Sequence, residues 1–288
     1  MGDWRGGGDY WLSHKAFRLE SITMIGIFDS GVGGLTVVKE IFKQLPGYQI
    51  IYFGDTARIP YGSRSEQFIR RYSKKITQWL LKKEAKIIVI ACNTSSAWAA
   101  ESLKKEFKGV PIFEVITPAA KDALIKTRNK KVGVIGTRGT IKSSAYSKRL
   151  LSFDPKVKVF LRACPLFVPL VEEGWIKEKT TEEIAKKYLA VLKKSGVDTL
   201  ILGCTHYPLL KEIIKKTVGP GVKIVSSAEN VAKEVKEFLR NNPEIEKQIK
   251  KGKNHQFFFS DKPYNLDKIS HLCFDRKIKA KILDPFSK

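Results

Sequence analysis

From Met24 onward the chain alternates short apolar segments with longer amphipathic ones, and this alternation restricts the possible folds more than any other feature. Residues 87–91 form an almost purely apolar run of strand length, which is typical of a strand covered on both faces. Residues 68–83 place apolar side chains on one side of a helix. Alternating strands and helices predict an α/β fold with parallel sheets.

The predicted elements follow the same order in both halves of the chain. Strands are predicted at 25–28, 49–53, 87–91, 111–115, 131–135, 157–161, 199–202 and 222–225, and helices at 35–42, 68–83, 96–107, 141–151, 181–194 and after Pro208. A further apolar strand at 256–260 could complete the first sheet by crossing back.

Two pairs of segments in the chain resemble each other. "VGVIGTRGTIKSSAY" is similar to "IGIFDSGVGGLTVVK", and "TLILGCTHYPLL" is similar to "IIVIACNTSSA". Asp29 and Thr137 lie 108 residues apart, and Cys92 and Cys204 lie 112 apart, so the two offsets nearly agree. The repeat predicts two similar parallel-sheet α/β domains related by pseudo-twofold symmetry, with the active site in the cleft between them.

The domain boundaries follow from this repeat. We expect residues 24–118 and 226–288 to form the first domain and residues 119–225 the second. Residues 1–23 differ in composition and are expected to be a flexible N-terminal extension.

Composition narrows the function classes. Lys and Arg number 53 against 29 Asp and Glu, a net charge of +24 that raises the possibility of nucleic-acid binding. Much of the lysine alternates with glutamate, as on a solvated helix face, so a nucleic-acid partner is not expected. No apolar run approaches the length of a membrane span and no secretory signal is visible, so we expect a cytoplasmic protein without a membrane partner. The four cysteines are scattered and form no CxxC pair, which gives no support for a zinc site or a disulfide framework.

Two of the cysteines follow the most apolar strands of the two halves. Cys92 comes after 87–91 and Cys204 after 200–203. Ligands bind at the carboxyl ends of strands in open α/β sheets, and a following helix N-terminus stabilises a thiolate there. Either cysteine alone could be a packing residue, but two at matching positions of a repeat indicate a catalytic pair.

A pair of equivalent thiols fits the inversion of a carbon stereocentre. One thiolate removes the α-proton from one face, and the other thiol delivers a proton to the opposite face. A free thiol titrates near pH ~8.5, so it can act as base in one direction and as acid in the other.

Further polar residues surround these positions in the sequence. Asp29 and Ser30 follow the first strand, where Asp29 could assist a thiol or simply cap the next helix. Glu172 lies in an apolar, proline-punctuated segment, and His206 lies two residues after Cys204; either could instead be an ordinary surface or packing residue. Asn93, Thr94 and Thr205 are neutral donors that could bind a carboxylate, and Tyr61 and Gly62 lie in a polar loop with little value for a core.

At these residues the sequence resembles the glutamate racemases, within the aspartate/glutamate racemase superfamily. The similar blocks are "GIFDSGVGGLTVV", "YFGDTARIPYGSRS", "ACNTSSA", "IGTRGTIKS", "CPLFVPLVEEG" and "LGCTHYPLL", in the family's order. The resemblance implies interconversion of L- and D-glutamate without pyridoxal phosphate, other cofactor or metal, and a supply of D-glutamate for peptidoglycan. It also implies a homodimer.

The resemblance further implies individual roles. Cys92 acts on the D-enantiomer with help from Asp29, and Cys204 acts on the L-enantiomer with help from Glu172 and His206; Glu173 is the less favoured alternative to Glu172. The implied substrate-binding residues are Asp29, Ser30, Tyr61, Gly62, Asn93, Thr94, Thr137, Thr140, Thr205 and His206. An aspartate racemase is the nearest alternative, which His206 disfavours because those enzymes typically carry Glu at this position.

Overall fold

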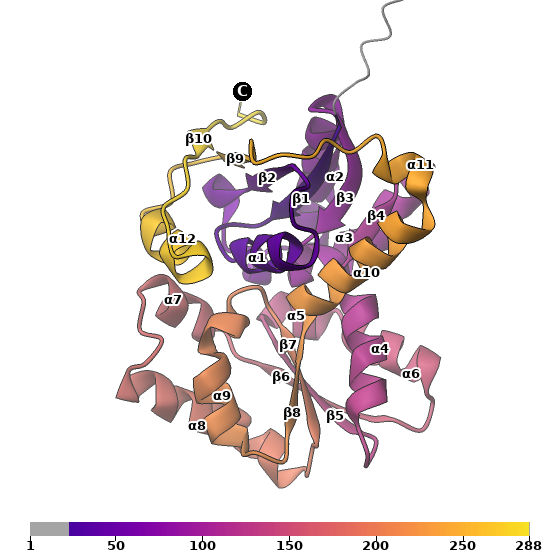
Figure 1. Cartoon of the computed structure of the whole chain (residues 1–288). Helices are drawn as coiled ribbons and strands as arrows, with labels where there is room; N and C mark the ends of the chain where they lie inside the picture. Colours follow the sequence, from indigo (N-terminus) through magenta and orange to yellow (C-terminus); the bar gives the residue numbers. More distant parts are fainter. Residues whose placement is uncertain (1–22, 288) are drawn as a thin grey trace, which may run out of the picture.

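Parallel β-sheets form the centre of both halves of the chain. The computed structural model describes residues 23–287, which contain ten strands in two sheets (Figure 1). The strands are β1 (Met24–Asp29), β2 (Ile50–Gly54), β3 (Ala85–Ile90), β4 (Ile112–Glu114), β5 (Lys131–Gly136), β6 (Lys158–Ala163), β7 (Thr199–Gly203), β8 (Lys223–Ser226), β9 (Gln256–Phe259) and β10 (Lys281–Ile282). All pairs of neighbouring strands run parallel, which confirms the predicted fold class.

Helices connect these strands and cover both faces of each sheet. They are α1 (Leu35–Gln44), α2 (Glu66–Lys82), α3 (Asn93–Glu106), α4 (Ile116–Lys126), α5 (Arg138–Lys142), α6 (Ala145–Phe153), α7 (Phe167–Glu172), α8 (Lys179–Lys194), α9 (Lys211–Val218), α10 (Ser227–Asn241), α11 (Pro243–Glu246) and α12 (Leu266–Phe274). None of the described helices combines the length and the apolar character that a bilayer-spanning segment needs.

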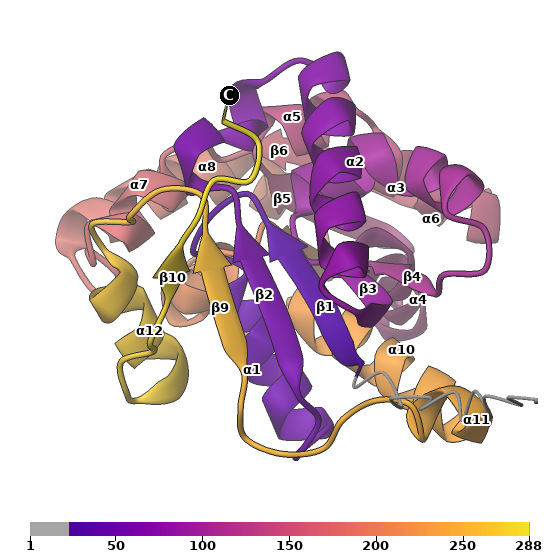
Figure 2. The same ribbon diagram turned by 90° about the horizontal axis from the view of Figure 1, so that it is seen from above.

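The two sheets repeat one strand order. The first is arranged β10-β9-β2-β1-β3-β4 and the second β6-β5-β7-β8, so β1 to β4 and β5 to β8 occupy equivalent places. The expected return of the 256–260 strand is confirmed, because β9 pairs with β2 in the first sheet, and β10 follows it at the edge (Figure 2). The internal repeat of the sequence is therefore a repeat of structure.

Two equivalent helices join the halves. α4 packs on β7 and β8 of the second sheet, α10 contacts α1 and β4 of the first, and the two helices pack against each other (Figure 1). Ala119 and Ala123 on α4, and Val231 and Val235 on α10, are fully buried in one continuous core, and Asn230 of α10 donates a hydrogen bond to Asp122 of α4 at 3.0 Å.

Several predicted boundaries differ from the structure. The helix predicted at 96–107 begins three residues earlier, at Asn93. The helix predicted at 141–151 is divided into α5 and α6, because Ser144 adopts a left-handed conformation with φ 57°. The segment around Glu172 forms the short helix α7, which its two prolines had concealed.

Residues at the predicted domain boundaries lie in or beside helices and strands. Of the predicted extension, residues 1–22 lie outside the described residues, and Thr23 pairs with Ile249 in an isolated parallel bridge. Pro118 lies within the first turn of α4, and Ser226 caps α10 by accepting a hydrogen bond from the Glu229 amide. The boundaries near 118 and 226 stay predictions.

Burial predicts how strongly individual valines stabilise the fold. Val134 on β5 is fully buried, whereas Val191 on α8 is 47% exposed. Val134→Ala removes two buried methyl groups and leaves a cavity, so we expect the free energy of unfolding to fall by about 2 kcal/mol. Val191→Ala should change it by less than about 0.5 kcal/mol. Urea unfolding followed by circular dichroism measures both, and equal effects would contradict this assignment of the core.

Candidate active site

Four strand ends meet at one cavity between the two sheets. Asp29 ends β1, Cys92 follows β3, Thr137 follows β5 and Cys204 follows β7. The winding reverses between β1 and β3 in the first sheet and between β5 and β7 in the second. Such switch points leave a crevice at the carboxyl ends of the strands. The cavity holds about 400 Å³, enough for a small polar molecule.

Most of the residues predicted for the site line this cavity. They are Ser30, Tyr61, Gly62, Cys92, Asn93, Thr94, Thr137, Glu172, Cys204, Thr205 and His206. Asp29 and Thr140 are fully or almost fully buried directly behind the lining. The structure thus brings the whole predicted set together.

Cys92 occupies the N-cap of α3. Its sulfur accepts a hydrogen bond from the Ser95 amide at 3.5 Å and lies 3.6 Å from the Ser30 hydroxyl. We expected the helix N-terminus to favour the thiolate. Burial and the nearby Asp29 carboxylate outweigh these hydrogen bonds and raise the pKa of Cys92 to about 11. At neutral pH Cys92 is therefore a protonated thiol, able to act as an acid.

Cys204 has different surroundings. The α-helix that follows it starts only at Lys211, after a 3₁₀ turn at Tyr207–Leu210, so the expected helix N-terminus is not adjacent to this thiol. Its neighbour is instead His206, whose Nδ1 lies 3.9 Å from the Cys204 sulfur. The repeat places the two sulfurs equivalently, and different groups accompany them, as the family resemblance implied: Asp29 is near Cys92, and His206 is beside Cys204.

His206 joins Cys204 to an acidic residue. Its Nε2 lies 3.0 Å from Oε1 of Glu172, and both ring nitrogens thus have partners. Burial alone would lower the pKa of His206, but the contacts with Cys204 and Glu172 raise it to about 10. His206 is therefore an imidazolium at neutral pH. Its positive charge therefore lies next to the Cys204 sulfur.

Asp29 is fully buried beneath the loop that follows β1. Its Oδ2 accepts hydrogen bonds from the amides of Gly31 at 3.0 Å and Gly34 at 3.1 Å, and its Oδ1 accepts a weaker one from the Thr205 hydroxyl at 3.4 Å. Burial raises the pKa of Asp29, and the positive charge of His206 and these hydrogen bonds oppose that rise. Asp29 therefore organises the loop before α1 and also lies at the cavity. The alternative that Asp29 caps the next helix is wrong, because the N-cap of α1 is Gly34.

Close approaches between the halves need glycine. A Cβ at Gly33 would lie 2.5 Å from ring atoms of His206 and from the Thr205 hydroxyl. A Cβ at Gly62 would lie 2.7 Å from Cβ of Thr137. Since real side chains cannot approach this closely, the backbone of the first half packs directly on the second half's site residues.

The neutral polar residues form two hydrogen-bonded groups. The hydroxyls of Thr94, Thr137 and Thr140 lie within 3.0–3.1 Å of one another and so connect the halves. The Tyr146 hydroxyl donates to Oδ1 of Asn93 at 2.7 Å, which fixes the orientation of that amide. Tyr61 donates to Asp55 at 2.6 Å, so its hydroxyl is already engaged.

Some lining residues were not predicted. They are Gly31, Ile59, Pro60, Ser63, Arg138, Pro165, Val168 and Pro169. Arg138 could have been suspected, because it directly follows Thr137 in a predicted strand-to-helix turn. The prolines and Val168 gave no signal, because their place depends on how the loop before α7 folds over the cavity.

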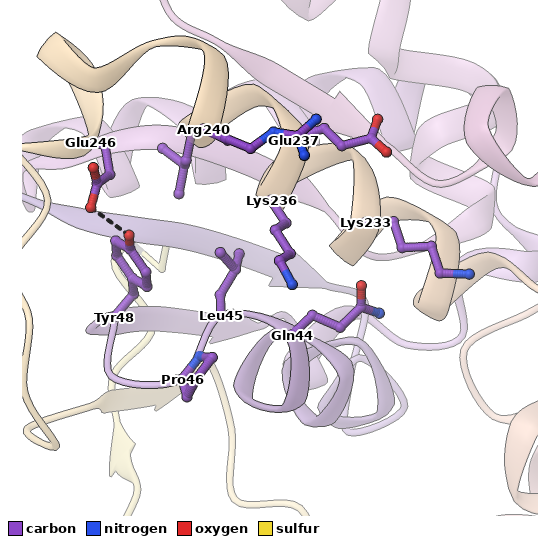
Figure 3. A pocket seen from close by; sticks show the side chains of 10 residues that line it. Gln44, Leu45, Pro46, Tyr48, Lys233, Lys236, Glu237, Arg240 and Glu246 are labelled. Atoms are coloured by element: carbon purple, nitrogen blue, oxygen red, sulfur yellow. Dashed lines mark hydrogen bonds between the residues drawn. The ribbon is translucent and has the colours of Figure 1, made fainter.

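A larger groove of about 710 Å³ lies elsewhere, between the end of α1 and α10. It contains no cysteine, histidine or other residue predicted for the site. Its lysines do not converge on one point, since Lys233 and Lys236 extend in different directions (Figure 3). The chemistry therefore points to the smaller cavity. Within residues 23–287 no group of three or more His, Cys, Asp or Glu side chains is arranged to hold a metal ion.

Comparison with known proteins agrees with the geometry of the site. A sequence model of the Asp/Glu/Hydantoin racemase family matches residues 25–235. A glutamate racemase of Geobacter metallireducens is 51% identical over 254 residues, which span 88% of this chain and 93% of the relative.

Solved structures agree as well. The glutamate racemase isoform RacE1 of Bacillus anthracis has a TM-score of 0.86 at 38% identity, covering 92% of this chain and 99% of that one. A glutamate racemase of Francisella tularensis, solved in complex with D-glutamate, has a TM-score of 0.82 at 36% identity and covers 91% and 97%.

The resemblance found from the sequence blocks is thus confirmed over most of both chains, and the shared fold places the two thiols at one cavity. The chain belongs to the Asp/Glu/hydantoin racemase family.

Proposed function

We propose that this chain is a glutamate racemase that inverts the α-carbon of glutamate with Cys92 and Cys204 as its acid and base. The observation that carries the proposal is that two thiols, from equivalent strands of a repeated fold, line one cavity. Relatives named glutamate racemase, similar over nearly their whole length, support this substrate. The similarity to aspartate racemases is 20% in identity and extends to the fold alone.

The reaction from L- to D-glutamate needs one base and one acid. The thiolate of Cys204, beside the His206 imidazolium, takes the α-proton and becomes a thiol. The electron pair left at the α-carbon is delocalised into the α-carboxylate. The Cys92 thiol then gives its proton to the opposite face and becomes a thiolate, so proton and charge balance.

In the reverse reaction, from D- to L-glutamate, the two thiols exchange the roles of acid and base. Cys92 must then lose its proton despite burial and the Asp29 carboxylate. A substrate ammonium in the cavity brings a positive charge that offsets this carboxylate. Asp29 can therefore assist Cys92 only with substrate bound, whereas His206 and Glu172 support Cys204 at all times.

Neutral donors suit the recognition of the substrate. We assign Asn93, Thr94 and Thr205 to carboxylate binding, since they line the cavity. Asn93 and Thr94 are held by neighbouring hydroxyls, and Thr205 makes a weak hydrogen bond to Asp29. Ser30, Tyr61, Gly62 and Thr137 complete the wall, with Thr140 behind it. A role in supplying D-glutamate for peptidoglycan, a homodimer and a cytoplasmic location stay predictions, and the comparisons give no support to nucleic-acid binding.

Isotope exchange tests the proposed reaction. Wild-type protein incubated with L-glutamate in deuterated buffer, without added cofactor, should abolish optical rotation while deuterium appears at the α-carbon. Cys92→Ser and Cys204→Ser should each lose racemisation by at least about 10²-fold, because both steps need a thiol. Cys273→Ser, a buried thiol of α12 outside the cavity, serves as the matched control. Full turnover by either of the first two variants would end the two-thiol mechanism.

The pH profile tests the role of Glu172. The imidazolium of His206 is lost as pH rises through its pKa of about 10, and the thiolate of Cys204 then loses its positive partner. Glu172→Gln removes a carboxylate that raises this pKa, so the alkaline limb of kcat/KM should move to lower pH. An unchanged limb, measured with L-glutamate between neutral pH and pH ~11, would show that Glu172 does not act through His206.

The glycine contact at His206 offers a steric test. Gly33→Ala places a methyl group where ring atoms of His206 lie, so it must displace the ring or the loop. Because displacements of about 1 Å can cost about 10²-fold in rate, we expect a loss of that order in kcat/KM. Gly221→Ala adds the same methyl group where nothing lies within 4 Å and should leave kcat/KM unchanged. Equal activities of the two variants would contradict the close packing of this loop.

A further inference from the structure

The adjacent residues Glu172 and Glu173 at the end of α7 have different partners. Glu172 contacts His206 in the cavity, with 3.0 Å between Oε1 and Nε2. Glu173 accepts a hydrogen bond on its Oε1 from the Tyr264 hydroxyl, also at 3.0 Å. Tyr264 lies just before α12, in the segment that returns to the first sheet. Glu173 thus links the second half of the molecule to the first.

A lysine of α12 makes a second link at the same place. Nζ of Lys268 donates to the backbone carbonyl of Glu173 at 2.8 Å. A positive charge at the C-terminal end of a helix satisfies a free carbonyl and interacts favourably with the helix dipole. The next residue, Gly174, has φ 78°, and a Cβ there would lie 2.8 Å from the Lys268 side chain. The lysine therefore lies directly on the turn that ends α7.

The other end of α7 is fixed by its own half of the molecule. Phe167 is fully buried, and its ring meets those of Tyr188 and Tyr207 edge to face, both at 5.3 Å between centroids. α7 is thus anchored at its start in the second half and tied at its end to α12, and Glu172 lies at the tied end. The two helices are neighbours in Figure 1.

The segment that carries Tyr264 also forms a wall behind Glu172. A side cavity of about 170 Å³ is lined by Glu172 and Ile59, which also line the main cavity, and by Asp261, Tyr264 and Asn265. Movement of this segment would therefore change the surroundings of Glu172 directly.

We infer that Tyr264 and Lys268 form a cross-domain latch on Glu173 that positions Glu172 against His206. They are positioning residues, since neither lines the main cavity. Tyr264 is 74% exposed and both hydrogen bonds are exposed, so each contributes little and the latch can open with the cleft. The effect on turnover rests on the proposed function, whereas the effect on His206 does not.

The protonation of His206 provides a direct measurement. The charged or titratable groups around its ring are Cys204, Glu172 and Asp29, of which only Glu172 is tied to the latch. The double variant Tyr264→Phe/Lys268→Met should lower the pKa of His206, followed by NMR of histidine-labelled protein without substrate, with the signal assigned by His206→Asn. Lys268→Arg keeps a donor and should behave as wild type. Lys279→Met, an exposed lysine outside the latch, is the control.

Kinetics provide the second measurement. In the double variant kcat/KM should fall about three- to tenfold, with its alkaline limb displaced to lower pH as in Glu172→Gln but by less. A His206 pKa and an alkaline limb equal to those of wild type would overturn the latch, and so would a lowered Tm as the sole change. If the double variant folds poorly, Tyr264→Phe, which removes one oxygen atom, repeats the titration. A lowered His206 pKa in a protein without racemase activity would retain the latch and reject the proposed function.

Discussion

The cavity depends on close contact between the segment after β1 and the residues after β7. The Thr36 hydroxyl donates to the backbone carbonyl of Thr205 at 2.8 Å, and Gly33 leaves no space for a side chain against His206. This contact holds the carboxyl ends of two separate sheets together, and thiols from both sheets line one cavity.

The two thiols share a position in the repeated fold but not an environment. Cys92 lies beside a buried carboxylate and keeps its proton, and Cys204 lies beside an imidazolium. The enantiomers of an amino acid have equal free energies, so kcat/KM must be the same in both directions whatever the protein does. The different surroundings of the two thiols must therefore appear in the separate values of kcat and KM. They must also appear in the protonation state of the enzyme that binds each enantiomer.

The sequence allowed much of this structure to be predicted, because the features involved are local. The apolar run before Cys92 and the repeat that relates it to Cys204 required a parallel sheet with polar residues at its carboxyl end. The residues that escaped prediction depend on tertiary contacts. Val168 and Pro169 reach the cavity because α7 folds over it, and the partners of Glu173 come from α12 and the segment just before it, 91 and 95 residues further along the chain.

The electrostatic state of the thiols also lay beyond the sequence. A helix N-terminus beside Cys92 was predicted from the strand end, and it is present. The outcome at Cys92 was decided by burial and by Asp29, whose distance from the sulfur depends on two strands lying side by side. At Cys204 the expected helix begins too late, and the neighbouring imidazole takes its place as the positive group.

The pairing of α4 with α10 has a mechanical consequence. These helices are equivalents in the repeat, carry fully buried alanines and valines, and are joined by the hydrogen bond from Asn230 to Asp122. Away from the cavity, they also form the main contact between the two halves of the molecule. The pair therefore lies at the position of a hinge. A small rotation about it would widen the far side of the crevice and admit a ligand, while the buried core around the two helices stays inaccessible to water.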